Sequence, residues 1–294
     1  MKSIVVLSGK GGVGKSSISA SLAVSFSKDK KIICADCDVD ASNLSLLFSL
    51  YEKDYENWSP LSTNQIAAID KYKCIKCKKC IDTCYFDAIF SRNGYPSVNE
   101  FGCEGCCACE MICPAKAISM KNIDNAFIGH AKSGHGFYIV SAQLLPGFSG
   151  SGKVVSRVRQ KSEAIGKNAD YMLIDAAAGT GCPVIASVAG NDFALLVTEP
   201  TPSGLSDLKK ALKVVDHFKI NKGLIINKYD LNQDYAEKIE NFAKDKNINI
   251  LKRINFDKNI ISAMNKMIPV IDFDKKYEKV FMDIKNKIML EIKK

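Results

Sequence analysis

Eight cysteines fall in two runs whose spacing suits the binding of iron–sulfur clusters. The runs are Cys74-x2-Cys77-x2-Cys80-x3-Cys84 and Cys103-x2-Cys106-x2-Cys109-x3-Cys113. Three closely spaced thiolates can hold three irons of one [4Fe–4S] cube, while the fourth, three residues further on, turns toward the other cube. This pattern assigns Cys74, Cys77, Cys80 and Cys113 to a first cluster and Cys103, Cys106, Cys109 and Cys84 to a second.

The two runs resemble those of bacterial two-cluster ferredoxins. Zinc is the weaker interpretation, because zinc sites use sets of four ligands without the third x2-Cys step. Tyr85 and Phe86 stand where a proline usually follows the fourth cysteine, a departure that changes the local turn without removing a ligand. Cys107 adjoins Cys106 and is expected to be a spare buried thiol.

A glycine-rich stretch near the start of the chain could bind the phosphates of a nucleotide. Residues 9–16 read Gly-Lys-Gly-Gly-Val-Gly-Lys-Ser between an apolar run and a helical pattern, which is the context of a P-loop. Backbone N–H groups there can surround phosphate oxygens, with Lys15 neutralising charge and Ser16 ligating Mg²⁺. The residues expected to touch the nucleotide are Gly11, Gly12, Val13, Gly14, Lys15, Ser16 and Ser17.

Lys10 makes this P-loop resemble the deviant Walker A motif of the MinD/ParA-type ATPases and, more distantly, that of the nitrogenase iron protein. In that family the additional lysine reaches the nucleotide of a partner subunit. The resemblance therefore implies a dimer that sandwiches ATP, formed by two copies of the chain or with a paralogue. It implies catalytic roles for Lys10, Lys15 and Asp38, the last by orienting the attacking water.

Acidic residues near the ends of two expected strands extend the resemblance. Asp36, Asp38 and Asp40 follow one strand, and residues 173–175 are similar to a Walker B strand that ends in Asp175. The resemblance implies that Ser16, Asp36 and Asp175 hold Mg²⁺, with Asp40 as the alternative to Asp36.

The nucleotide base is expected to contact Asn227, again by resemblance. Residues 227–230 read Asn-Lys-Tyr-Asp, which also fits the guanine-reading motif of GTPases. The Lys10 signature favours ATP, and GTP stays open as the alternative.

Cys182 lies seven residues after Asp175, a spacing that resembles the nitrogenase iron protein, where a cysteine in this region binds a cluster shared across the dimer. That arrangement needs two cysteines per subunit, and none lies between Cys113 and Cys182. Two interpretations stay open. Cys182 is either a labile site for a transient cluster, metal or cargo, or a small residue packed beneath the helix that begins at Pro183.

Alternating strands and helices must position these residues. Short β-branched runs at 4–8, 31–36, 171–175, 193–198 and 223–227 are followed by helical patterns, which predicts a doubly wound parallel α/β sheet. The two cysteine runs superpose with an offset of 29 residues, so they form two copies of one unit. We expect a small α+β ferredoxin-like domain at 64–122, with connectors 52–63 and 123–145, inserted after the second strand's helix into an ATPase domain of 1–51 and 146–294.

The composition narrows the remaining possibilities. With 294 residues, 47% hydrophobic and 25% charged, the chain can bury a sizeable core. Clustered cysteines and a start that runs directly into an apolar strand predict a reducing, cytoplasmic location. The charge of +9 comes from scattered lysines without interleaved aromatics, so no nucleic-acid partner is expected. The C-terminal stripe of Tyr277, Val280, Phe281, Ile284 and Ile288 is expected to pack on the protein's own sheet rather than on a membrane.

Together these features predict an iron–sulfur ATPase, slow and stimulated by a partner. Mg·ATP binding and hydrolysis in a dimer would be coupled to electron transfer through two [4Fe–4S] clusters. One alternative is an ATP-dependent carrier or assembly factor for iron–sulfur clusters or metallocofactors, and another is a non-hydrolysing regulatory switch. The partner is expected to be a redox or iron–sulfur client protein, and lysines at 71, 73, 76, 78 and 79 could dock an acidic one.

Overall fold

The computed structural model describes residues 1–148 and 150–293, which form two compact units. The first unit comprises Met1–Trp58, Ile128–Gln143 and Ser151–Lys294, and the second comprises Ser59–Phe127 and Leu144–Gly150. Within the described residues, no helix combines the length and the apolar character needed to cross a bilayer.

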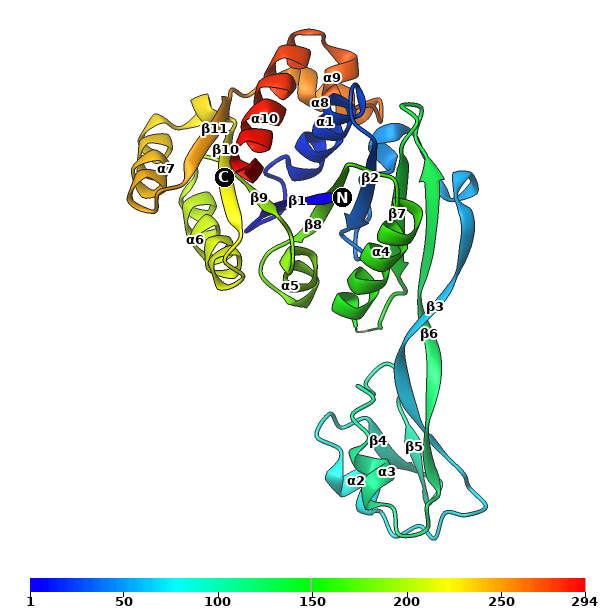
Figure 1. Ribbon diagram of the computed structural model, residues 1–294. Helices are drawn as coiled ribbons and strands as arrows, with labels where there is room; N and C mark the ends of the chain where they lie inside the picture. Colours follow the sequence, from blue (N-terminus) through cyan, green and yellow to red (C-terminus); the bar gives the residue numbers. More distant parts are fainter. Residues whose placement is uncertain (149, 294) are drawn as a thin grey trace. The chain divides into compact units, whose positions relative to one another are not determined.

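The first unit contains most of a sheet with the strand order β11-β10-β9-β1-β8-β2-β7-β6-β3 (Figure 1), whose strands β3 and β6 lie mostly in the second unit. Every neighbouring pair from β11 to β7 is parallel. Central strands of such a sheet are buried on both faces and are therefore almost continuously apolar. The strands are β1 (Lys2–Ser8), β2 (Ile32–Cys37), β3 (Glu56–Ile69), β6 (Ile118–Lys132), β7 (Tyr138–Leu144), β8 (Tyr171–Ala178), β9 (Phe193–Thr198), β10 (Asn221–Asn227) and β11 (Asn249–Ile254).

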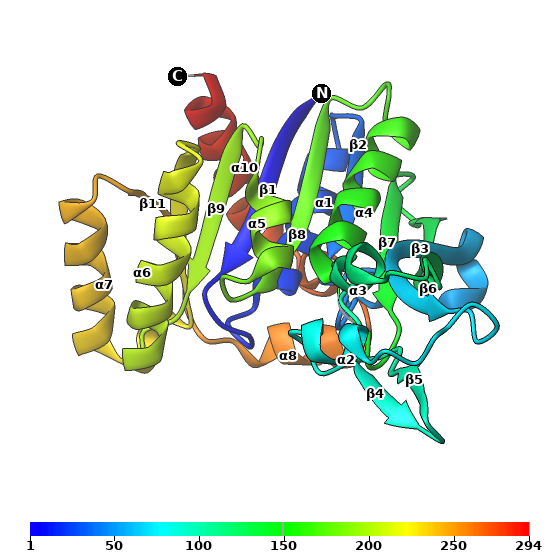
Figure 2. The same ribbon diagram turned by 90° about the horizontal axis from the view of Figure 1, so that it is seen from below.

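Helices cover both faces of this sheet (Figures 1 and 2). On one face lie α1 (Lys15–Ser27) and α10 (Lys276–Lys293), with α8 (Lys258–Asn265) and α9 (Val270–Phe273) beside them. On the other face lie α4 (Ser151–Ile165), α5 (Cys182–Val188) and α6 (Pro202–His217), with α7 (Gln233–Asp245) next to α6. The predicted doubly wound α/β fold is therefore confirmed.

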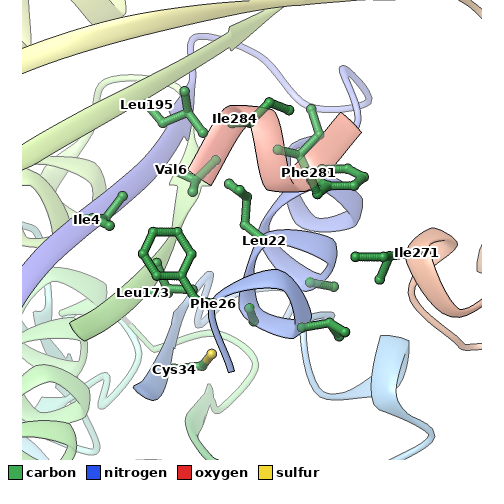
Figure 3. Packing of buried hydrophobic residues seen from close by; sticks show 14 of the residues in the cluster. Ile4, Val6, Leu22, Phe26, Cys34, Leu173, Leu195, Ile271, Phe281 and Ile284 are labelled. Atoms are coloured by element: carbon green, nitrogen blue, oxygen red, sulfur yellow. The ribbon is translucent and has the colours of Figure 1, made fainter. Parts of the chain in front are cut away.

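The core between α1, α10 and the sheet contains the C-terminal stripe. Figure 3 shows part of this cluster, with Leu22 and Phe26 of α1, Phe281 and Ile284 of α10, and the sheet residues Ile4, Val6, Leu173 and Leu195. Each of these side chains is at most 3% exposed, and burying one such side chain stabilises the fold by about 1.5–3 kcal/mol. The prediction that the stripe packs on the protein's own sheet is confirmed.

The second unit contains two short helices and a small antiparallel sheet. These are α2 (Lys79–Thr83), α3 (Ala108–Ile112), β4 (Ile89–Arg92) and β5 (Tyr95–Val98). The 29-residue repeat is visible in the backbone: Lys76 and Lys78 have φ of 59° and 63°, and their counterparts Gly105 and Cys107 have φ of 65° and 66°. The two copies therefore bend in the same way before α2 and α3.

Two expectations about the insertion are wrong. Residues 123–145 are not a connector, because they contain the end of β6 and all of β7, and 128–143 belong to the first unit. Gly129, Gly134 and Gly136 interrupt the apolar pattern in this segment, so the sequence does not indicate β6 and β7, whose strand partners lie far away in the chain. No α-helix follows β2 either; 3₁₀ turns lie at η1 (Leu46–Phe48) and η2 (Glu52–Asp54), and a third, η3 (Tyr229–Leu231), follows β10.

Candidate nucleotide and cysteine sites

The glycine-rich loop joins the end of β1 to the start of α1 and rests on Asn227. Gly12 and Gly14 have φ of 80° and 90°, which favours glycine at both positions. A Cβ on Gly14 would lie 2.5 Å from Asn227 Nδ2, so only glycine permits this approach. Asn227 Nδ2 donates to the Val13 carbonyl at 2.8 Å, and Lys228 Nζ donates to the Gly12 carbonyl at 3.0 Å. The strand end at β10 thus supports the loop from outside.

Two carboxylates lie side by side beneath the loop because β2 and β8 pair in parallel with Asp36 opposite Asp175. Asp175 is 1% exposed and accepts from Lys15 Nζ at 2.8 Å and from the hydroxyls of Ser16 and Ser19 at 2.7 Å each. The helix that begins at Lys15 therefore presents three donors to one carboxylate.

Asp36 is fully buried, and its carboxylate accepts from Ser42 Oγ at 2.6 Å and from the Leu44 N–H at 3.0 Å. Burial, followed by the negative charge of Asp175, raises the pKa of Asp36 to about 7. Hard oxygen ligands of this kind, next to a serine hydroxyl, form the donor set that suits Mg²⁺. The residues Ser16, Asp36 and Asp175 therefore fit a magnesium site, whereas Asp40 is exposed.

A cavity of about 630 Å³ opens beside these carboxylates, which is within the range of small-molecule sites. Asp38 lines it and is half-buried; burial raises the pKa of its carboxyl. Asn227 Oδ1 is buried and has no hydrogen-bond partner among the described residues, so a polar ligand group could satisfy it. The other lining residues include Gly11, Gly12, Gly14, Lys15, Ser16, Ser17, Phe256, Ile260 and Met264. A cavity lined by both polar and apolar side chains suits a nucleotide, which has charged phosphates and an apolar base.

Lys10 points to its own subunit and is held there by Glu199, a residue that sequence reasoning missed. Its Nζ lies 2.6 Å from Glu199 Oε1 and 2.9 Å from Ser203 Oγ. Glu199 also accepts from Lys228 at 2.8 Å, and these two lysines lower the pKa of its carboxyl despite partial burial. Ser19 was missed as well, and the sequence indicated Lys228 only as part of the motif at 227–230. The sequence signal for Glu199 was its position directly after the strand β9, because the carboxyl ends of parallel strands lie at the same sheet edge as the P-loop.

In the second unit the eight cysteines line two separate cavities. One cavity is lined by Cys74, Cys77, Cys80 and Cys113, and the other by Cys84, Cys103, Cys106 and Cys109. The structure thus brings together the two crosswise sets that the spacing suggested. In the described residues no three His, Cys, Asp or Glu side chains converge on a single ion; each thiol set instead surrounds a cavity.

Backbone N–H groups point at three of these sulfurs. Ala88 donates to Cys84 Sγ and Ala117 to Cys113 Sγ, each at 3.3 Å, and Ala67 donates to Cys103 Sγ at 3.5 Å. Such donors stabilise a thiolate. Burial raises the pKa of Cys80, and raises that of Cys109 to about 11, so metal binding must displace a proton there. The residues present fit two four-thiolate clusters.

Two other cysteines differ from expectation. Cys182 is exposed as the first residue of α5, so the interpretation as a packed core residue is wrong. Cys107 is only partly buried, donates its S–H to the Gly105 carbonyl at 3.5 Å, and lines the second cavity. Its φ of 66° places the side chain at the turn before α3 rather than in a core.

Residues 4–270 match the CobQ/CobB/MinD/ParA nucleotide binding domain family. The chain belongs to this family. An uncharacterized protein of Methanocaldococcus jannaschii is 35% identical over 237 residues, covering 80% of this chain and 82% of that protein. The iron–sulfur cluster carrier protein of the same organism is 25% identical over 304 residues, covering 98% of this chain and 84% of the relative.

Solved structures in the family share the fold. The septum site-determining protein MinD of Pyrococcus horikoshii, complexed with Mg-ADP, superposes with a TM-score of 0.60 at 20% identity. The likeness covers 100% of this chain and 98% of that one. This chain therefore shares the overall fold of that structure.

Proposed function

We propose that this family member is an iron–sulfur ATPase that couples Mg·ATP binding and hydrolysis, in a dimer, to electron transfer through two [4Fe–4S] clusters. The observation that carries the proposal is the pair of cavities lined by four cysteines each, in a chain that also carries a P-loop. We place the protein in the cytoplasm, where thiolate ligands stay reduced.

In this proposal each residue of the nucleotide site has a separate role. The backbone from Gly11 to Ser17 surrounds the phosphates and Lys15 neutralises their charge, while Ser16, Asp36 and Asp175 hold Mg²⁺. Asp38 orients the attacking water, and Asn227 contacts the base. Lys10 leaves Glu199 and reaches the nucleotide of the partner subunit.

The cysteine sites favour electron transfer over delivery. Each cavity has a complete set of four thiols. Three of the eight sulfurs, those of Cys84, Cys103 and Cys113, also accept a hydrogen bond from a backbone N–H group. Bound clusters accept and release single electrons. A cluster that is delivered to a client needs ligands that release it easily, whereas Cys80 and Cys109 are buried in the core of the second unit and Cys84, Cys103 and Cys113 pack against that core.

The test is anaerobic reconstitution followed by electron paramagnetic resonance of the dithionite-reduced protein, with and without Mg·ATP. We expect about eight irons per chain and a spectrum or midpoint potential that responds to the nucleotide. The Lys15→Ala variant should keep its iron and lose the response. Full iron content with no nucleotide response in the wild type would contradict the coupling, and binding without hydrolysis would favour a regulatory switch. Repeating the titration with GTP decides the base preference.

Cys182 supports a second candidate function, that of an iron–sulfur cluster carrier. It is exposed at the start of α5, in the segment that follows β8, the strand that carries Asp175. A relative aligned over nearly the whole chain is named an iron–sulfur cluster carrier protein. If this function holds, Cys182→Ser should reduce transfer of iron to an apo-acceptor without lowering the resident iron content. Unchanged transfer would eliminate the role of Cys182.

A further inference from the structure

The surroundings of the two cysteine sites are nearly opposite in charge although their backbones repeat. Five lysines lie around the first run, at 71, 73, 76, 78 and 79, and all five are exposed. We call them the lysine face. The repeat places Glu100, Gly102, Gly105, Cys107 and Ala108 at the corresponding positions of the second run, which instead carries Glu104 and Glu110. The shared backbone therefore does not require lysine at any of these places.

Two of the lysines occupy backbone positions that do not favour them. Lys76 and Lys78 have φ of 59° and 63°, a left-handed conformation uncommon for residues other than glycine. At the position of Lys76 the other copy has glycine. The backbone conformation by itself therefore does not account for lysine at these two positions.

The lysine face has little internal charge neutralisation. Lys73 lies 3.8 Å from Asp70 in an exposed pair, and Lys76 lies over the ring of Tyr95. Within residues 1–148 and 150–293, Lys71, Lys78 and Lys79 form no salt bridge. Their charges therefore act on whatever approaches from solvent.

This face borders the first cysteine site directly. Lys78 and Lys79 line its cavity together with Cys74, Cys77 and Cys80, and Cys77 is exposed. Tyr72 is fully exposed and Ile75 is 64% exposed between the lysines. Apolar side chains within a charged rim are the usual composition of a protein docking surface.

We propose that the lysine face docks an acidic one-electron donor protein, which reduces the site formed by Cys74, Cys77, Cys80 and Cys113. The inference rests on the proposed electron transfer and names the partner class for it. One electron moves from the donor's redox centre to this site, so the donor is oxidised by one electron, and no bond is made or broken. Cys77, a predicted cluster ligand, is exposed beside Lys78 and Lys79, which favours a redox protein over a nucleic acid as the partner of these lysines.

The test uses flavodoxin, an acidic flavin protein, as the probe, with binding to the anaerobic holoprotein measured at low and high salt. We expect binding that weakens as salt rises, and at least about tenfold weaker binding when Lys71, Lys73, Lys78 and Lys79 are changed together to Gln. The matched control changes Lys121, Lys213, Lys244 and Lys246 to Gln, which removes the same charge from exposed positions elsewhere. This control should bind the probe as the wild type does.

Three results would overturn the proposal. These are wild-type binding no tighter than that of the lysine-face variant, an equal loss in the control, or tighter binding of basic cytochrome c than of flavodoxin. Bulk transfer RNA that competes as well as flavodoxin would assign the face to nucleic acid and also overturn it. Because dithionite reduces the clusters without any protein partner, the nucleotide response of the spectrum still tests the proposed function when docking fails.

Discussion

A single carboxylate, Glu199, connects three parts of the nucleotide site. It binds Lys10 at 2.6 Å and Lys228 at 2.8 Å, and Lys228 in turn binds the P-loop carbonyl of Gly12. Partly buried charge pairs of this kind are stronger than exposed ones, because solvent screens them less. Glu199 therefore holds Lys10 against its own subunit.

Changing Glu199 to Gln should release Lys10 while keeping the size of the side chain. In the variant, Lys10 can move toward a partner's nucleotide without first breaking its ion pair with residue 199. We therefore expect dimers to form at an ATP concentration several-fold lower than in the wild type. Sedimentation velocity across an ATP titration measures this. Ser203→Ala, which removes only the 2.9 Å hydrogen bond to Lys10, is the control and should shift the titration less. A Glu199→Gln protein that needs as much ATP as the wild type would contradict the role.

Asp36 predicts how the metal-free protein responds to pH. Its pKa is raised from 3.8 to about 7 in the folded state, chiefly by burial. A carboxyl whose pKa is raised by folding destabilises the native state as pH rises from about 4 through 7, because the unfolded chain ionises more easily. Asp36→Asn removes this penalty. In Mg²⁺-free buffer we expect the variant to gain a few degrees in Tm relative to the wild type at pH 8 and little at pH 4. An equal effect at both pH values would contradict the assignment.

At the scale of elements, each cysteine site depends on a tight turn before a short helix. Gly105 has φ of 65°, and a Cβ there would lie 2.5 Å from the Gln65 carbonyl oxygen. Gln65 belongs to β3, so this glycine sets how closely the second cysteine loop packs on the strand. The first loop makes the same turn with Lys76 in place of glycine.

Gly105→Ala should therefore damage the second site and spare the first. The added Cβ clashes with backbone and also strains the left-handed turn, which together displace Cys103 and Cys106. We expect iron content to fall from about eight to about four per chain on reconstitution, measured by colorimetric iron analysis. Gly102→Ala is the control, since a Cβ there meets nothing closer than 3.4 Å and should leave the iron content unchanged. Equal iron loss in both variants would contradict the role of Gly105, because it would show that any added side chain in this loop prevents iron binding.

The central strands and the P-loop could be predicted from sequence because their signals are local. The strands expected at 4–8, 171–175 and 193–198 lie in β1, β8 and β9, and glycines with a lysine and serine specify the loop between β1 and α1. The role of Glu199 could not be predicted, because its contact with Lys10 exists only when β9 lies next to β1. β7 was missed for a similar reason, since its pairing with β2 spans about a hundred residues. Exposure of Cys182 depends on tertiary packing that spacing does not encode.

At the scale of the whole molecule, the net charge of +9 is unevenly placed. Five lysines and three aspartates lie between residues 70 and 87, whereas residues 99–116 carry three glutamates and one lysine. Positive charge near a cluster favours the form that holds an additional electron, and negative charge opposes it. The two sites should therefore differ in reduction potential even though their backbones match.

We expect the first site to have the higher midpoint potential, by an amount on the order of tens of millivolts. A redox titration followed by electron paramagnetic resonance measures both values. Changing the four lysines Lys71, Lys73, Lys78 and Lys79 to Gln should lower the potential of the first site. Changing Glu100, Glu104 and Glu110 to Gln should instead raise that of the second. Coincident potentials that neither variant separates would show that solvent screens these charges completely.

The unequal charge of the two cysteine repeats predicts the order in which electrons would reduce the two sites of the second unit. With clusters bound, the first electron to arrive would occupy mainly the site nearest the lysines, where the higher potential is expected. A second electron would then occupy mainly the site among the glutamates, at the more negative potential expected there. The doubly reduced protein would therefore be a stronger reductant than the singly reduced one, by an amount on the order of tens of millivolts.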